Sequence, residues 1–306
     1  MDECCCSPQP GERGTIRPKA GFDAAEDVDA LKDAIEGLGT KENILIDVLT
    51  QRSNAQRQLI CEAYQEATGR TLLEDLKGDT DGNLQDLLVA LITPPAAYDC
   101  HEVMKAMDGI GTDNSALIEI FASRSTQQIQ ALREVYLKGE PSFSGVSAPD
   151  FRLTLCFRFQ GQRDESTTVD TEKAKEDAMA LYEAGENKWG TDESKFIQIL
   201  CQRSIPQLRQ TFVEYKNISG KTLQQSIEGE MSGDLEELLV AIVKCVKNVP
   251  AYLAERLYHS MKGGGTDEAT LNRIMVSRSE IDLLDIRAEF KKLYEYSLLS
   301  AIEVSF

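Results

Sequence analysis

The chain has 306 residues, 42% hydrophobic and 27% charged, and its 51 acidic against 33 basic side chains give a net charge of −18. This composition is typical of a soluble globular protein. The negative charge argues against a nucleic-acid-binding protein and against direct contact with an anionic membrane, because both partners need basic side chains opposite their phosphates. A divalent cation could still bridge such a chain to phosphate.

Residues 1–20 are interpreted as an N-terminal tail. Their sequence begins MDECCCSPQPGERG and lacks the basic start and apolar core of a secretion signal. The eight cysteines of the chain form no CxxC motif, so free thiols in a reducing cytoplasm are expected. Cys4, Cys5 and Cys6 could carry a lipid or could simply belong to a disordered tail. The longest apolar stretch, Leu87–Ile92, is far shorter than the ~20 residues that span a bilayer.

The rest of the chain repeats itself four times. A Gly-Thr pair is followed by an Arg-Ser pair, with twelve residues from Thr to Arg in every copy. The threonines are Thr40, Thr112, Thr191 and Thr266, and the arginines are Arg52, Arg124, Arg203 and Arg278.

Between these markers the apolar residues have helical spacing. Positions five, eight and nine after each Thr are apolar, as in Leu45, Val48 and Leu49, and therefore share one helix face. Each Thr is predicted to be the N-cap of this helix. The Ser of each Arg-Ser pair is predicted to open the next helix through a capping box. The boxes are Ser53…Gln56, Ser125…Gln128, Ser204…Gln207 and a shorter variant, Ser279…Asp282.

Two further apolar blocks, at 87–92 and 238–243, begin at the same separation from Thr40 and Thr191, and both are predicted to be buried helices. The predicted fold class is therefore all-α, with four helical repeats around shared cores. The repeats are placed at 21–93, 94–160, 161–248 with a linker included, and 249–306.

The Gly-rich loop in front of each Thr could hold a cation. Unpaired carbonyls at a helix end, turned outward by glycines, are ligands that suit Ca²⁺ when a carboxylate completes the set. Asp79 follows Thr40 at the same separation along the chain as Glu230 follows Thr191. The alternative is that these are ordinary helix-ending glycines with surface acids nearby.

This pattern of GxGT, Arg-Ser and a distant acid resembles the core of the annexin family, over about residues 15–302. The resemblance implies a curved disc of four repeats with about five helices each, and Ca²⁺ as the bound ion. It implies two full ligand sets, the first made by Ile35, Gly37 and Gly39 with Asp79, the second by Gly185, Lys188 and Gly190 with Glu230. Weaker sets are implied at Met107, Gly109 and Gly111 and at Met261, Gly263 and Gly265. Leu38 and Trp189 at the loop tips are implied membrane contacts, although Trp189 could equally fold back onto the protein.

Two repeats depart from the family pattern. Repeat two looks about four residues short, so the position that corresponds to Asp79 falls near Val146, or at Phe151 when counted from Thr112 as in repeat one, and neither is an acid. The segment Phe151–Phe159 alternates with period two, which predicts a strand, whereas the resemblance implies a helix. In repeat four the corresponding position is Ser305, and the last helix of that repeat is expected to be missing.

The resemblance implies calcium-dependent binding of anionic membranes of the phosphatidylserine type at the cytoplasmic face. Membrane organisation, vesicle traffic and indirect inhibition of phospholipase A2 are the implied roles, with possible protein partners for the tail and no nucleic acid. The alternative is a calcium-insensitive protein-binding scaffold. An enzyme is not expected, because His101 and His259 are interpreted as ordinary helix residues and no nucleophile motif accompanies them.

Overall fold

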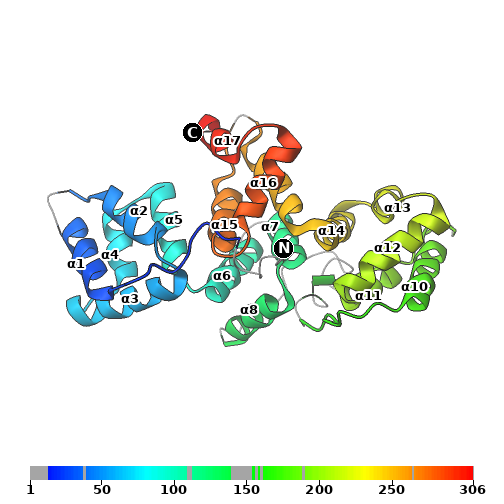
Figure 1. The fold of residues 1–306 in the computed structure, drawn as a ribbon, viewed down its shortest axis with the longest axis horizontal. Helices are drawn as coiled ribbons and strands as arrows, with labels where there is room; N and C mark the ends of the chain where they lie inside the picture. The colour runs from blue at the N-terminus through cyan, green and yellow to red at the C-terminus, as the bar shows by residue number, and fades with distance from the viewer. Residues whose placement is uncertain are drawn as a thin grey trace, which may run out of the picture. The chain divides into compact units, whose positions relative to one another are not determined.

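The computed structural model describes residues 13–36, 39–108, 112–138, 154–155, 158, 161–187, 190–263 and 265–305 (Figure 1). Within these residues the regular elements are sixteen α-helices and no strand, which confirms the all-α prediction. The chain divides into two compact units, one made of residues 1–98 and 253–306 and the other of residues 99–252. None of the described helices is long and apolar enough to cross a bilayer.

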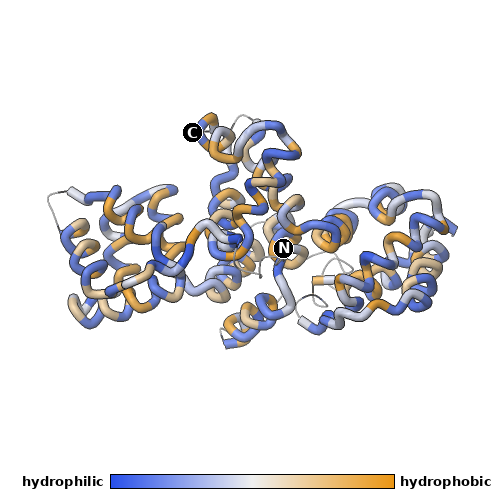
Figure 2. Tube along the Cα trace, viewed as in Figure 1, coloured by the Kyte–Doolittle hydropathy of each residue, from blue (hydrophilic) through white to orange (hydrophobic). Residues whose placement is uncertain are grey.

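The first part of unit 1 contains five helices that enclose one core. They are α1 (Ala24–Ile35), α2 (Glu42–Thr50), α3 (Asn54–Thr68), α4 (Leu72–Asp79) and α5 (Gly82–Ile92). Every helix contributes a side chain with no exposed surface, including Leu31, Leu45, Ile60, Leu76 and Leu88. Burying each such side chain contributes about 1.5–3 kcal/mol before entropy is subtracted. Figure 2 shows the resulting alternation of apolar and polar positions along single helices.

The second part of unit 1 contains the end of α14 (Gly233–Met261) with α15 (Glu268–Arg278), α16 (Leu283–Tyr294) and α17 (Leu298–Ser305). A short N-terminal segment, residues 13–19, joins the two parts. The backbone N–H groups of Thr15 and Ile16 donate to the carbonyl of Ser279 at 2.7 and 3.0 Å, and the N–H of Lys19 donates to Oε1 of Gln56 at 2.9 Å. Gly14 has no room for a side chain, because a Cβ there would lie 2.5 Å from the backbone of Glu280.

Unit 2 holds α7 (Asn114–Ser123), α8 (Thr126–Lys138), α10 (Thr171–Ala184), α11 (Glu193–Gln202), α12 (Ile205–Ser219) and α13 (Leu223–Glu230), with most of α6 (Pro95–Met107) and the first part of α14. Non-helical backbone at Asn248, two residues before Pro250, divides α14 into two helical stretches. The period-two segment in repeat two does not form a strand at its described residues. Thr154, Leu155 and Arg158 are helical there and buried.

The Arg of each Arg-Ser pair binds a carboxylate that the sequence reasoning missed, and Arg52, Arg124 and Arg278 are buried while Arg203 is partly exposed. Three of them pair with an aspartate of the first helix of the same repeat, through both carboxylate oxygens. These pairs are Arg52 with Asp27 (2.6 and 2.7 Å), Arg124 with Asp99 (2.8 and 2.8 Å) and Arg203 with Asp177 (2.6 and 3.1 Å). The signal was present in the sequence, because the Asp precedes the Arg at a nearly constant separation, 25 positions in two repeats and 26 in the third.

In repeat four the equivalent position is Leu253, and this changes the local structure. Arg278 pairs instead with Asp282, four residues later, at 2.6 and 2.7 Å. Asp282 becomes the N-cap residue of α16, while α15 runs on to Arg278. The prediction that Ser279 opens the next helix is therefore wrong. Ser53 and Ser125 do form complete capping boxes, whereas Ser204 caps Gln207 and the side chain of Gln207 turns to Asp170.

One helix end in repeat four carries backbone strain that repeats one and three avoid. The helices α3 and α12 end at Gly69 and Gly220, both at φ +73°, but α16 ends at Glu295 with φ +68°. This left-handed conformation costs an L-residue about 1 kcal/mol. We expect Glu295→Gly to raise the free energy of unfolding by about 0.5–1 kcal/mol in urea titrations. Glu295→Ala removes the same charge and keeps the strain, so an equal gain with Ala would contradict this explanation.

Candidate functional site

All four Gly-rich loops are closed by the same backbone hydrogen bond. The residue after each Thr donates its N–H to the carbonyl of the preceding helix's last turn, at 2.7–3.0 Å. The pairs are Lys41 to Ala34, Asp113 to Ala106, Asp192 to Ala184 and Asp267 to Ser260. The loop of repeat three is one residue longer than the others, since its bond spans eight residues instead of seven. This bond ties two helix ends together and leaves the loop between them projecting.

The threonine hydroxyl makes a long-range contact instead of capping a helix. Thr40 donates to the carbonyl of Asp79 at 3.1 Å, Thr191 to that of Glu230 at 3.2 Å, and Thr266 to that of Ser305 at 3.1 Å. The N-cap of the following helix is the next residue in each of these repeats, so the prediction of Thr as N-cap is wrong. The same contact explains why the separation along the chain is constant, because it fixes the fourth helix of the repeat against the loop. In repeat two both candidate positions, Val146 and Phe151, lie outside the described residues.

The carboxylates at this position are exposed and stand at helix ends. Asp79 is the last residue of α4 and Glu230 the last residue of α13, where the helical carbonyls lack intrahelical partners. Three residues later, Gly82 and Gly233 have φ of +55° and +72° and let the chain turn back sharply. Each of the two repeats thus presents one carboxylate beside a loop of carbonyl groups.

The loop glycines have the conformations that such a turn requires. Gly39 and Gly190 have φ of +85° and +82°, immediately before their threonines. Gly185 ends α10, and a Cβ there would lie 3.2 Å from the ring of Phe196. Ile35 is the last residue of α1 and is buried. The remaining loop positions of the expected sites, Gly37, Leu38, Gly109, Gly111, Lys188 and Trp189, lie outside the described residues.

These residues fit a hard cation held mainly by backbone oxygens. Nowhere in the described part of the chain do three or more His, Cys, Asp or Glu side chains come together as a metal cluster. A cation here would depend on loop carbonyls with a single carboxylate, a set that suits Ca²⁺. In repeats one and three the carboxylate lies beside the loop, and in repeat four Ser305 takes its place.

The repeat-four loop keeps the threonine contact but has Ser305 in place of the carboxylate, and its Gly265 lacks the positive φ of Gly39 and Gly190. Met261, Gly263 and Gly265 precede Thr266 in the chain. The hydroxyl of Thr266 donates to the carbonyl of Ser305, as the hydroxyls of Thr40 and Thr191 donate to their partners in repeats one and three. We expect Ser305→Asp to add a calcium site, detected as one additional binding event by isothermal titration calorimetry. Ser300→Asp is the matched control, since it adds the same charge earlier on α17. An equal gain in both variants would contradict a site built by the contact between Thr266 and Ser305.

An ion pair beside each complete loop was also missed from the sequence. Arg70 lies 3.5 Å from Glu36 in repeat one, and Lys221 lies 2.8 Å from Glu186 in repeat three. The pairing with Lys221 lowers the pKa of Glu186. Both basic residues occupy the same position relative to the Thr of their repeat, a coincidence that could have revealed them. In repeat four this position is Tyr296.

Comparison with known proteins accounts for this repeated arrangement. A family model described as Annexin matches residues 26–91, 98–139, 176–242 and 252–306. The chain belongs to the annexin family. Annexin A3 of Homo sapiens is 56% identical over 298 residues, covering 96% of this chain and 92% of the relative, and Annexin A3 of Bos taurus is 54% identical with the same coverage.

Solved annexin structures share the fold. The structure of annexin III matches with a TM-score of 0.95 and 54% identity, over 97% of this chain and 94% of that one. Chicken annexin V in complex with Zn²⁺ matches with a TM-score of 0.89 and 44% identity, over 96% and 94%. Annexin membership supports calcium-dependent phospholipid binding in general and a membrane-binding rather than catalytic protein. His101 and His259 are helix residues, on α6 and α14.

Proposed function

We propose that this annexin binds anionic membranes of the phosphatidylserine type through calcium sites that are complete only in repeats one and three. The supporting observation is the pair of equivalent contacts from the hydroxyls of Thr40 and Thr191 to the backbone carbonyls of Asp79 and Glu230, two residues that are exposed. Calcium at such a loop would meet lipid phosphate oxygens with its remaining coordination positions.

The ligands in repeat one would be the carbonyls of Ile35, Gly37 and Gly39 with the carboxylate of Asp79. Those in repeat three would be the carbonyls of Gly185, Lys188 and Gly190 with Glu230. Weaker sites would use the carbonyls around Met107, Gly109 and Gly111 and around Met261, Gly263 and Gly265. Leu38 and Trp189, at the tips of the two complete loops, would contact the membrane interface.

The acidity of the chain makes the proposed binding a switch. A net charge of −18 repels an anionic bilayer when calcium is absent. Each bound Ca²⁺ adds two positive charges at the surface that meets the lipid. The protein would therefore act reversibly at the cytoplasmic face of the plasma membrane or vesicles, in membrane organisation or vesicle traffic. Indirect inhibition of phospholipase A2 would follow from covering its lipid substrate.

Vesicle sedimentation tests this function. The protein is mixed with phosphatidylserine–phosphatidylcholine vesicles, or with phosphatidylcholine vesicles alone, in calcium or in chelator. We expect it to pellet with the anionic vesicles only, and far more strongly in calcium than in chelator. Equal pelleting with and without calcium would overturn the proposal, as would equal pelleting with both lipid compositions.

A calcium-insensitive scaffold is the second candidate. It is favoured by Ser305, which occupies in repeat four the position that holds a carboxylate residue in repeats one and three. Protein partners could be recruited through the N-terminal tail. Its mark would be a partner that stays bound in chelator together with unchanged thermal stability on calcium addition, because a ligand that binds only the native state raises its melting temperature.

A further inference from the structure

The surface beside the repeat-four loop differs in charge from its counterparts. In repeat one, Glu36, Arg70 and Asp79 flank the loop, and in repeat three the same positions are Glu186, Lys221 and Glu230. Each trio has a formal charge of −1. In repeat four the equivalent residues are Lys262, Tyr296 and Ser305, with a formal charge of +1. The position that suits a cation in repeats one and three therefore suits an anion in repeat four.

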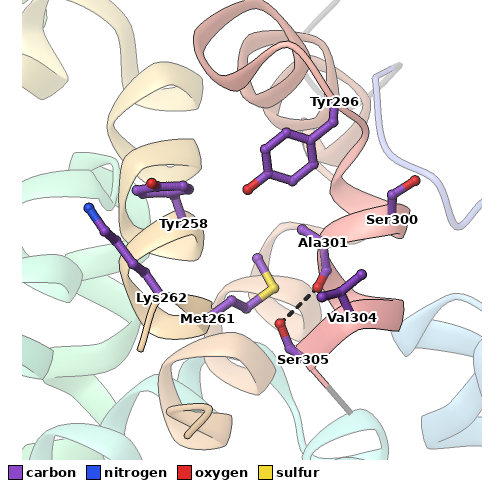
Figure 3. Close-up of a pocket in the computed structure, with 8 residues that line it drawn as sticks. All are labelled: Tyr258, Met261, Lys262, Tyr296, Ser300, Ala301, Val304 and Ser305. Atoms are coloured by element: carbon purple, nitrogen blue, oxygen red, sulfur yellow. Dashed lines mark hydrogen bonds between the residues drawn. The ribbon is translucent and has the colours of Figure 1, made fainter. Parts of the chain in front are cut away.

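A cavity lies beside the same residues. A pocket of about 310 Å³ lies between the end of α14 and helix α17, both in unit 1 (Figure 3). Its wall includes Tyr258, Met261, Lys262, Tyr296, Val304 and Ser305. In repeat one the position of Tyr296 holds Arg70, which reaches across to Glu36. The tyrosine makes no such ion pair, and its hydroxyl points toward Tyr258.

Aromatic packing fixes the walls of this pocket. The ring of Tyr258 stacks on Tyr294 with centroids 3.9 Å apart, and Tyr296 meets Phe290 edge-on at 5.6 Å. At the rim, the ammonium of Lys262 lies 5.2 Å from the centroid of Tyr258. Met261 and Val304 add apolar surface, and Val304 is 87% exposed. The pocket thus joins one exposed cation to a preformed apolar wall and several hydroxyl groups.

We propose that this pocket binds the phosphate-bearing headgroup of an anionic lipid directly, without calcium, with Lys262 opposite the phosphate and the tyrosine wall against the adjoining apolar carbons. Charge complementarity selects an anion, and the apolar wall selects an amphiphile over a free ion. The proposal goes beyond calcium-dependent membrane binding, because it does not involve Asp79, Glu230 or the loops of repeats one and three.

Calorimetric titration in chelator tests the proposal, with the full chain and with dihexanoyl phosphatidylserine kept below its micelle concentration. We expect saturable binding to the wild-type chain. Lys262→Glu should weaken the binding about tenfold, since it reverses one charge at an exposed site. Lys262→Arg should leave it unchanged. The double variant Lys262→Glu with Tyr296→Arg recreates the Glu36–Arg70 pair of repeat one and should abolish binding while thermal unfolding stays cooperative.

The matched control is Lys292→Glu, the same charge change on α16, where Lys292 is exposed and pairs with Glu289 at 3.1 Å. An equal loss in this variant would overturn the proposal, because it would indicate only general electrostatic attraction. Equal affinity for inorganic phosphate would overturn the lipid assignment, and so would equal affinity for dihexanoyl phosphatidylcholine. Failure of calcium-dependent sedimentation would leave this result unaffected, since the titration contains no calcium.

Discussion

Replacing Asp79 by Asn together with Glu230 by Gln should raise the calcium concentration needed for vesicle sedimentation by at least about tenfold. Both side chains are exposed at helix ends, so the exchange removes two negative charges and barely alters packing. The threonine contacts involve the backbone carbonyls of these residues and should survive. The measurement is sedimentation with phosphatidylserine vesicles over a calcium series, with urea unfolding to confirm an intact fold.

The matched control exchanges two acids close to the same helix ends, Asp81 to Asn and Glu228 to Gln. Both are exposed and lie two residues from the target positions, so the net charge changes equally. The control should sediment as the wild type does. If it loses as much binding as the first variant, the overall charge of the protein, and not the placement of the two carboxylates beside their loops, determines the calcium response.

Arg124→Met should lower the free energy of unfolding by about 3–5 kcal/mol. The guanidinium is completely buried and binds both carboxylate oxygens of Asp99 at 2.8 Å, so the substitution leaves an unpaired buried charge. Urea or thermal unfolding measures the loss. Adding Asp99→Leu should recover most of it, because a buried ion pair replaced by apolar groups of similar size is often close to neutral.

Arg203→Met provides the comparison within the same unit. Its side chain is 28% exposed and its partner Asp177 is also reached by Lys173 at 3.5 Å. Water and this lysine compensate the carboxylate, so the loss should be clearly smaller than for Arg124. Equal losses at both positions, or a loss below about 1 kcal/mol at Arg124, would contradict the argument from burial.

The helical cores of the repeats could be predicted because their signal is local. Leu45, Val48 and Leu49 share a helix face by spacing alone, and all three are buried. The blocks at 87–92 and 238–243 likewise lie in α5 and α14. Such patterns need no knowledge of which distant segment covers the face, since any apolar helix stripe must be covered.

Predictions that depended on distant partners were less successful. Thr40 is a residue type that often caps a helix N-terminus, but its hydroxyl donates instead to the carbonyl of Asp79, far along the chain. Ser279 follows an Arg as Ser53 does. In repeat four, however, Leu253 stands where the other repeats have the aspartate that pairs with this Arg, and Arg278 pairs with Asp282 instead. A local motif states what a residue can do, and the fold decides which of several possible partners it meets.

The candidate site shows the same division. The positions of Asp79 and Glu230 followed from a repeated spacing, and the structure brings both beside their loops. The pocket at Tyr258 and Tyr296 gave no comparable signal, because Lys262 and Tyr296 have no counterpart of the same type in repeats one and three. It becomes visible when the fourth loop is compared, residue by residue, with the ion pairs of the first and third.

The discontinuous course of unit 1 sets an order of events during synthesis. Unit 2 is a continuous stretch, residues 99–252, and all of it is synthesised before residues 253–306. Unit 1 cannot be completed until residues 253–306 have been synthesised. Thr15 and Ile16 donate to the carbonyl of Ser279, and Asn54 donates its N–H to the side chain of Glu280 at 2.6 Å. The first repeat therefore emerges earliest and reaches its final partner last. During translation the side of α5 that packs against α15 therefore stays exposed until residues 268–278 have been synthesised.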